Sequence, residues 1–273
     1  MAQTFLTLEP TGEHRWSVVV TDGLAAGRGD HRFLFGGAGL ACAVQAMELA
    51  SGRPAIWATA QYLSYVRPGS RVDIAVDLAT VGRAITQARA TLSHDGKDII
   101  TATAALGQRD GPSDQWASHA AVPPPEECAD IEHWNAGASI GGRFRFRPAH
   151  GYFGYAPTHG RQDDGRLLFW MRPVDDVPID RSVLAVMADF FTPGIRNATG
   201  QVLGGNSLDN TIRYGAVVPT DWVLCDVFLE AIASGFTLGT MRIYARDGTL
   251  MASASQSMIL RDRSGTVPKE KQS

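Results

Sequence analysis

The sequence predicts an α+β fold of two similar units, each with one long helix wrapped by a curved antiparallel sheet. The first observation behind this prediction is a weak internal repeat. Residues 35–106 and residues 181–260 both start with an apolar helical segment and continue as a series of β-type runs. The second is a similar turn among the runs of each copy, His94-Asp95-Gly96 and Arg246-Asp247-Gly248. A helix that is apolar on nearly all sides needs broad cover, which a curling sheet provides.

The first unit is expected over residues 1–110. Its helix is predicted from an Ala-rich apolar stretch with glycines at its start and Gly52 after its end. One strand is predicted from the strict alternation of apolar and polar residues between Arg71 and Leu78. In chain order we expect a β-hairpin over 4–20 with its turn at 11–13, the helix over 37–50, a strand ending in YVRPG at 65–69, and strands over 71–78, 83–92 and 98–106.

Residues 111–137 are expected to form a linker, because glycines and prolines interrupt the pattern there. The second unit is expected over 138–263, followed by a disordered polar tail over 264–273. Two such units can pair their sheets edge to edge, which removes exposed strand edges. In chain order we expect a short polar helix around 126–135, strands at 142–147 and 166–172, a helix over 181–191 that stops before Pro193-Gly194, and strands near 207–215, 221–231, 235–246 and 249–261.

Composition and charge place the chain among ordinary globular proteins. Of its 273 residues, 44% are hydrophobic and 19% are charged, which suits a protein with a substantial core. The formal net charge of -3 gives no positive field to gather nucleic acid or an anionic membrane surface. We see no run as long as a membrane span and no secretory signal. We therefore expect a cytoplasmic protein with neither nucleic-acid nor membrane partners.

Cysteines and histidines indicate neither a disulfide framework nor a metal site. Cys42, Cys128 and Cys225 are far apart and odd in number, and none has C-x-x-C spacing. The seven histidines show no metal-binding spacing such as H-E-x-x-H. We therefore expect no metal and no cofactor.

Two motifs resemble those of other enzymes but lack the required context. Residues 137–141 match G-x-S-x-G, yet the preceding strand and the later acid and histidine of a serine hydrolase are missing. Residues 33–42 resemble a dinucleotide-binding turn, but the sixth position of the motif is Cys42 and an antiparallel meander follows. Neither a serine hydrolase nor a nicotinamide enzyme is expected.

Asp189 and Gln256 are polar residues in apolar surroundings, and the first unit has no equivalent pair. Asp189 lies in the helical stretch VLAVMADFF, where burying a carboxylate is costly unless it is paired or hydrogen-bonded. The alternative is an aspartate at the helix end that reaches water. Gln256 is a lone amide on a strand face and needs a partner, either in a site or in a structural cross-link. The apolar residues of that face are Ala252, Ala254, Met258 and Leu260.

Gly36 and Gly37 stand at the start of the first helix. Without side chains, their amides can approach a ligand and polarise a carbonyl group, although close packing of the helix on the sheet would equally favour glycine. In the second unit, Ser207 opens a predicted strand, where its hydroxyl could instead cap a turn. Asp209 would share its face and is a rival candidate acid.

Four short stretches make the chain resemble the acyl-CoA thioesterase II family, whose members are double hotdog proteins. The resemblance implies that Asp189, Ser207 and Gln256 activate a water that attacks a thioester carbonyl directly, without an acyl-enzyme. It also implies that the amides of Gly36 and Gly37 stabilise the oxyanion and that the substrate is an acyl-CoA. We further expect the protein to form a homo-oligomer. The stretches are FGG at 35–37, YVRPG at 65–69, NSLDNTI at 206–212 and DGTLMASASQSMILR at 247–261, with MADF at 187–190 matching the segment of the catalytic aspartate.

The chain departs from the family pattern at two positions. Ser207 stands where the family usually has threonine, and Asn210 where histidine is common.

The alternative function is that of a non-hydrolytic hotdog protein that binds acyl-CoA or acyl carrier protein. A hotdog hydratase is disfavoured. Such enzymes carry a D-x-N-P-x-H motif on a strand, and Asp209-Asn210-Thr211 has neither its spacing nor its histidine. The acyl group depends on how far side chains such as Trp57, Tyr62, Phe190, Phe191 and Met258 intrude into the pocket.

Overall fold

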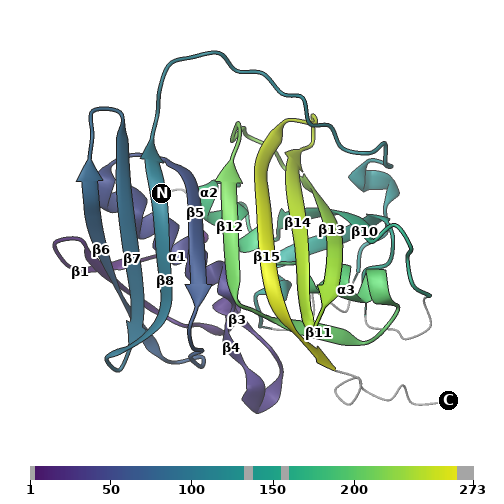
Figure 1. The fold of residues 1–273 in the computed structure, drawn as a ribbon, viewed down its shortest axis with the longest axis horizontal. Helices are drawn as coiled ribbons and strands as arrows, with labels where there is room; N and C mark the ends of the chain where they lie inside the picture. The colour runs from purple at the N-terminus through teal and green to yellow at the C-terminus, as the bar shows by residue number, and fades with distance from the viewer. Residues whose placement is uncertain (1–3, 132–137, 155–159, 263–273) are drawn as a thin grey trace.

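The computed structural model describes residues 4–131, 138–154 and 160–262. Within these residues, thirteen strands form one sheet in the order β1-β2-β6-β7-β8-β5-β12-β15-β14-β13-β10-β9, with β11 paired to β15 beside this path (Figure 1). The strands are β1 (Glu9–Gly12), β2 (Arg15–Val19), β5 (Ala55–Tyr62), β6 (Arg71–Val81), β7 (Ile85–His94), β8 (Lys97–Gly107), β9 (Phe144–His150), β10 (Arg166–Pro173), β11 (Leu203–Ser207), β12 (Asp209–Tyr214), β13 (Val223–Ala233), β14 (Phe236–Ala245) and β15 (Leu250–Asp262).

The sheet is antiparallel at every strand pair of the described residues. Strands of the first half of the chain lie on one side of the β5–β12 pair and those of the second half on the other. This pairing joins residues 57–61 to residues 209–213, so segments about 150 residues apart in sequence become neighbours. Two very short strands, β3 (Ala25–Ala26) and β4 (Phe33–Leu34), pair with each other separately.

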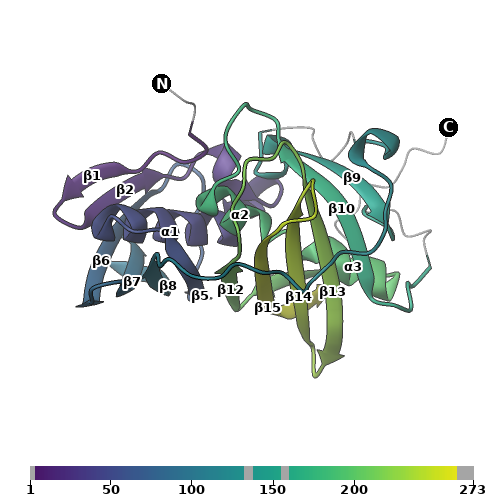
Figure 2. The same cartoon turned by 90° about the horizontal axis from the view of Figure 1, so that it is seen from above.

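Three α-helices of the described residues lie on one face of the sheet, and its two ends bend toward that face (Figure 2). They are α1 (Gly36–Ser51), α2 (Arg181–Met187) and α3 (Thr192–Thr199). The first helix is followed by Gly52, which caps its end. The φ of 64° at Gly52 is a left-handed conformation that glycine adopts without strain. Short 3-10 turns are η1 (Asp22–Leu24), η2 (Gly29–His31), η3 (Pro125–Glu127) and η5 (Gly141–Arg143).

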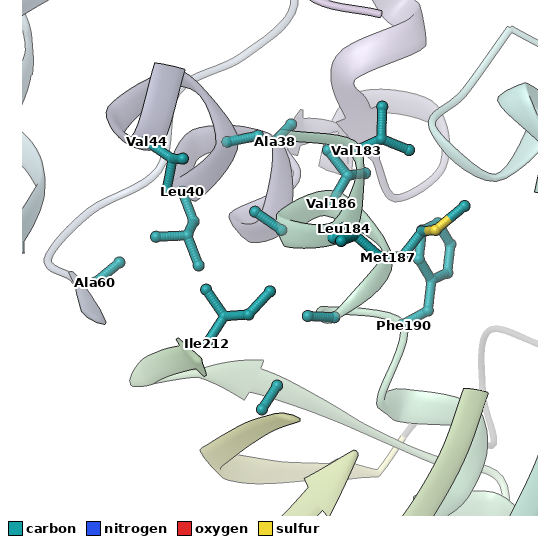
Figure 3. Close-up of a cluster of buried hydrophobic side chains, with 14 of the residues drawn as sticks. Ala38, Leu40, Val44, Ala60, Val183, Leu184, Val186, Met187, Phe190 and Ile212 are labelled. Atoms are coloured by element: carbon teal, nitrogen blue, oxygen red, sulfur yellow. The ribbon is translucent and has the colours of Figure 1, made fainter. Parts of the chain in front are cut away.

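The core between the helices and the sheet is apolar and continuous. Helices α1 and α2 pack against each other, and α1 also packs on β5 to β8. Because α1 is built largely from alanine and glycine at this contact, the two helix backbones can approach closely. Figure 3 shows the meeting point, with Ala38, Leu40 and Val44 from α1, Val183, Leu184, Val186 and Met187 from α2, Phe190 from the turn that follows, and Ala60 and Ile212 from the sheet.

Most predicted elements occur, with bounds shifted in the first half and two larger differences in the second. In the first half the hairpin turn lies at 13–14 and β5 ends at Tyr62, before YVRPG at 65–69. The predicted helix over 181–191 ends at Met187, and α3 begins at Thr192, where the sequence suggested a stop. Pro193 belongs to the first turn of α3, a position where proline is favoured because its missing N–H would have no helical partner. The strand predicted near 207–215 is divided at Leu208 into β11 and β12, so Ser207 closes one strand instead of opening the next.

The segment expected to link two units has no helix or strand over residues 108–124. The polar helix predicted around 126–135 is reduced to the turn η3 in its described part, and residues 132–135 lie outside the described residues. The predicted disordered tail over 264–273 also lies outside them. The division into units over 1–110 and 138–263 stays a prediction.

Candidate active site

Asp189 lies in the turn between α2 and α3 and is only 4% exposed. Its Oδ2 accepts a hydrogen bond of 2.7 Å from the backbone N–H of Gly37. Its Oδ1 accepts one of 3.3 Å from the Ser207 hydroxyl and another from the Gln256 amide. The same amide nitrogen donates to the Ser207 Oγ at 2.7 Å. The three residues predicted as catalytic therefore form one hydrogen-bonded cluster, and the alternative of a solvent-facing Asp189 is wrong.

An irregularity in the sheet places Ser207 beside Gln256. Strand β15 pairs first with β12, up to Thr211 opposite Ser255, and then with β11, from Ser207 opposite Met258. Residues 208–210 therefore stand opposite only residues 256–257, as in a β-bulge, a feature that is common beside active sites. Gln256 itself is 2% exposed on the inner face of β15, which confirms the predicted alternation of that strand.

The N-terminus of α1 supplies the remaining contact to the carboxylate. Gly37 is in the first helical turn, where backbone N–H groups have no acceptor within the helix. A carboxylate placed there is stabilised by these donors and by the helix dipole. The space is very tight, because a Cβ at Gly37 would lie 2.7 Å from the Asp189 Cβ and 2.8 Å from the Val186 carbonyl oxygen. Glycine at this position is therefore required by the approach of the turn that carries Asp189.

Burial raises the pKa of the Asp189 carboxyl from the ordinary 3.8 to about 6. The hydrogen bonds from Gln256, Gly37 and Ser207 oppose the rise, and the amide of Asn210 has the smallest opposing effect. Asn210 is fully buried, and its two side-chain polar atoms lack a partner at hydrogen-bond geometry among the described residues. A carboxyl group with such a pKa is largely ionised at neutral pH and basic enough to accept a proton.

Gly36 and Gly37 differ in what their amides do, which corrects the expectation that both face a substrate carbonyl. The Gly37 N–H is already engaged by Asp189, so it orients the carboxylate. Gly36, in contrast, lies on the wall of a cavity of about 580 Å³, a volume within the usual range for small-molecule sites. Of the two predicted oxyanion donors, only Gly36 borders open space.

The cavity brings the candidate residues together with side chains from both halves of the chain. Asp189 and Ser207 lie on its wall with Gly36, and so do Tyr62 and Met258, two of the residues expected to limit an acyl pocket. The other three, Trp57, Phe190 and Phe191, are not among its lining residues.

The rival acid Asp209 is separate from the Asp189 cluster. Its Oδ1 accepts a hydrogen bond of 3.0 Å from the backbone N–H of Ser257, which holds the irregular part of the β12–β15 pairing. Among the described residues, no group of three or more His, Cys, Asp or Glu side chains is placed to hold a metal ion. No described helix is long and apolar enough to cross a membrane.

Sequence reasoning missed two features of this site, the hydrogen bond from the Gly37 amide to Asp189 and the place of the Tyr62 ring beside Gly36, although Tyr62 was expected to limit the pocket. Both depend on contacts between residues far apart in the chain: Gly37 and Asp189 are 152 positions apart. The FGG stretch at 35–37 marks these glycines as candidates, but nothing in the sequence indicates that the Gly37 amide donates a hydrogen bond to a carboxylate.

Comparison with known proteins identifies the chain over most of its length. Residues 26–107 match the family model described as the acyl-CoA thioesterase N-terminal domain, and residues 118–260 match the acyl-CoA thioesterase C-terminal domain. No curated protein matches the sequence.

Solved structures agree with these matches. A candidate thioesterase from Novosphingobium aromaticivorans is 32% identical, with a TM-score of 0.85 over 94% of this chain and 100% of its own. A hotdog-fold protein from Alicyclobacillus acidocaldarius is 20% identical, with a TM-score of 0.80 over 96% and 97% of the two chains. Acyl-CoA thioesterase II TesB2 from Mycobacterium marinum is 18% identical, with a TM-score of 0.74 over 95% and 97%. The last two likenesses concern the fold.

Proposed function

The chain belongs to the acyl-CoA thioesterase family, and from this premise we propose that it hydrolyses acyl-CoA through a water activated by Asp189. It is a thioester hydrolase with a hotdog fold. The observation that carries the proposed mechanism is the buried Asp189 carboxylate, held by three donors on the wall of the cavity. A base fixed in this way is oriented before the substrate arrives, which is the usual requirement for general-base catalysis.

The proposed reaction needs no covalent enzyme intermediate. Asp189 removes a proton from a water molecule while the water oxygen forms a bond to the thioester carbonyl carbon. The carbonyl oxygen becomes an oxyanion, which the Gly36 amide stabilises at the start of α1. Collapse of this intermediate breaks the carbon–sulfur bond, and the leaving CoA thiolate takes up the proton held by Asp189, which regenerates the carboxylate. The products are the free acid and CoA.

Ser207 and Gln256 are proposed to fix the base and the water. The Gln256 amide donates to both the Asp189 Oδ1 and the Ser207 Oγ. The serine hydroxyl in turn donates to the carboxylate at 3.3 Å and retains a lone pair directed away from these partners. Serine offers the same hydroxyl as the threonine usual in the family, with a less restricted χ1 angle.

We also propose that the chain consists of two hotdog units, over 1–110 and 138–263, joined by a linker over 111–137. The separate matches to an N-terminal and a C-terminal domain support this division, as does the packing of α1 on β5 to β8. The active cluster would then draw Gly36 and Gly37 from one unit and Asp189, Ser207 and Gln256 from the other. A cytoplasmic location and a homo-oligomeric assembly stay predictions.

The proposed function is tested by measuring free thiol release from acyl-CoAs of graded chain length, with the same acyl groups on acyl carrier protein beside them. Hydrolysis of the CoA series supports the proposal, and its length profile identifies the acyl class. Binding of acyl-CoA without release of thiol would contradict it and favour the non-hydrolytic alternative. Faster release from the carrier-protein series would contradict the proposed carrier.

The pH dependence of catalysis is expected to follow the ionisation of Asp189. Because the pKa of this carboxyl is raised to about 6 and the ionised form is the base, log(kcat/KM) should rise with pH at a slope of about one below 6 and level off above it. Thiol release measured from acidic to mildly alkaline pH, with the fold monitored by circular dichroism, checks this. A profile that stays level through pH 6 would contradict a base with this pKa.

Replacing Gln256 with alanine should lower turnover far more than stability. The variant loses the amide that orients the carboxylate, and we expect kcat to fall roughly 10²-fold. The Gln256 Oε1 has no hydrogen-bond partner among the described residues, so the bonds lost are those of its nitrogen, about 1 kcal/mol for the one to Ser207 and about 2 kcal/mol for the one to the ionised Asp189. Steady-state kinetics and urea unfolding measure the two effects. Ser255→Ala, on the opposite face of β15, is the control, and a large loss of stability with little loss of kcat would make the amide structural.

A further inference from the structure

Tyr62 carries a buried hydroxyl that the proposed mechanism does not use. It is the last residue of β5, and its backbone N–H donates to the Leu208 carbonyl oxygen at 3.0 Å. Tyr62 is among the residues that line the cavity, and its Oη atom is fully buried without a hydrogen-bond partner among the described residues. Buried hydroxyl groups nearly always have a partner, so an unpaired one on a residue that lines a ligand cavity suggests that the ligand supplies it.

The end of the Tyr62 ring that bears the hydroxyl lies beside Gly36. A Cβ placed on Gly36 would lie 2.8 Å from the Asp189 Oδ2 and 3.0 Å from the Tyr62 Cζ, the carbon that bears the hydroxyl. The same small volume is therefore bordered by the proposed base, by the Gly36 backbone and by the phenol. A reacting carbonyl group beside Asp189 would be within reach of the Tyr62 hydroxyl.

The oxyanion of the proposed mechanism also lacks a second donor. The Gly37 amide is occupied by Asp189, so of the two predicted backbone donors the Gly36 amide remains, on a residue that lines the cavity. Two or more preorganised donors are typical of sites that stabilise an oxyanion. Tyr62 can fill this place only if it keeps its proton. Burial, and then the carboxylates of Asp189 and Asp209, raise the pKa of the Tyr62 phenol well above its usual value, so it remains a neutral donor.

We infer that Tyr62 is a catalytic residue whose hydroxyl donates a hydrogen bond to the thioester carbonyl oxygen, beside the Gly36 amide. The inference rests on the proposed function and adds a donor to it. The sequence suggested another role for Tyr62, as a side chain that limits the acyl pocket. The two roles use different parts of the residue, since a wall needs the ring and an oxyanion donor needs the hydroxyl.

Tyr62→Phe separates the two roles, because it removes the hydroxyl and keeps the ring. Loss of one oxyanion donor should lower kcat roughly 10²-fold while KM changes less than about threefold. Tyr244→Phe is the matched control, since Tyr244 is a fully buried tyrosine whose hydroxyl also lacks a partner at hydrogen-bond geometry among the described residues and which lies outside the cavity lining. A kcat of Tyr62→Phe equal to that of Tyr244→Phe would overturn the inference.

A binding experiment keeps this test independent of turnover. Two stable substrate analogues are compared: one in which methylene replaces the thioester sulfur and the carbonyl remains, and an alkyl-CoA thioether without the carbonyl oxygen. Tyr62→Phe should weaken binding of the ketone analogue by about fivefold, as expected for a lost hydrogen bond, and leave the thioether unchanged. Equal effects on both analogues would overturn the inference. If the native protein releases no thiol, the proposed function fails, while selective loss of ketone binding would still support the contact.

Discussion

Replacing Asp189 with asparagine is expected to lower kcat roughly 10⁴-fold, the upper end of the range for general-base catalysis. Asparagine has nearly the same shape but cannot accept a proton at working pH. It also presents an NH₂ group to one of the donors that now surround the carboxylate, so the cluster cannot be satisfied in its present form. Those donors are the Gly37 N–H, the Ser207 hydroxyl and the Gln256 amide.

The loss of activity should not come from unfolding. The pKa of Asp189 is about 6 in the folded protein, against the ordinary value of 3.8 that applies to the unfolded chain. Because the pKa of this acid is higher in the folded protein, its ionisation lowers the free energy of unfolding. The loss is about 3 kcal/mol above pH 6 and disappears as the pH falls below 4. Asparagine removes the buried charge, so the variant should remain folded at pH 8.

Thiol release and thermal unfolding of Asp189→Asn test both statements. The matched control is Asp209→Asn, which alters the neighbouring carboxylate that accepts from the Ser257 N–H and should retain most of the turnover. If Asp209→Asn loses as much activity as Asp189→Asn, or if Asp189→Asn keeps it, the assignment of the base is wrong.

The second large effect is expected from Gly36→Ala, with a fall in kcat/KM of roughly 10³-fold. The added methyl group would lie 2.8 Å from the Asp189 Oδ2 and 3.0 Å from the Tyr62 Cζ, closer than carbon atoms normally approach. It would displace the carboxylate and fill the space where the thioester carbonyl is proposed to lie. Alanine is otherwise favoured over glycine within a helix by up to about 1 kcal/mol, so intrinsic helix propensity does not oppose the substitution.

Steady-state kinetics of Gly36→Ala, read beside its unfolding temperature, check this prediction. Gly111→Ala is the control: a Cβ at Gly111 would meet no atom within 4 Å, in a segment without a helix or strand. An active Gly36→Ala enzyme would mean that the substrate carbonyl lies elsewhere in the cavity.

Patterns within short segments predicted much of the fold. Helix α1 follows from an Ala-rich stretch followed by Gly52, and β6 from the alternation that starts at Arg71. Asp189 and Gln256 could be selected because each is polar in an apolar segment, and such groups need partners when buried. In these cases the local sequence and the final packing require the same residue type.

The parts that were missed depend on contacts between distant segments. The first turn of helix α3 contains a Pro-Gly pair that resembles a stop, and tertiary packing against β10, β11 and β13 holds the helix in place. The break at Leu208 exists because β15 pairs with two strands in succession. The occupied Gly37 amide and the hydroxyl of Tyr62 acquire their roles only when α1, β5 and the turn after α2 come together.

The origin of the oxygen in the product tests the central claim, direct attack by water at the Asp189 cluster, most directly. Enzyme in excess over acyl-CoA would complete a single turnover in ¹⁸O-labelled water, and mass spectrometry would follow both the acid and the peptide that contains Asp189. We expect one ¹⁸O atom in the acid after the first turnover and none in the Asp189 carboxylate. Unlabelled acid with ¹⁸O in Asp189, or an acylated peptide trapped during turnover, would contradict direct attack and show that the carboxylate acts as a nucleophile.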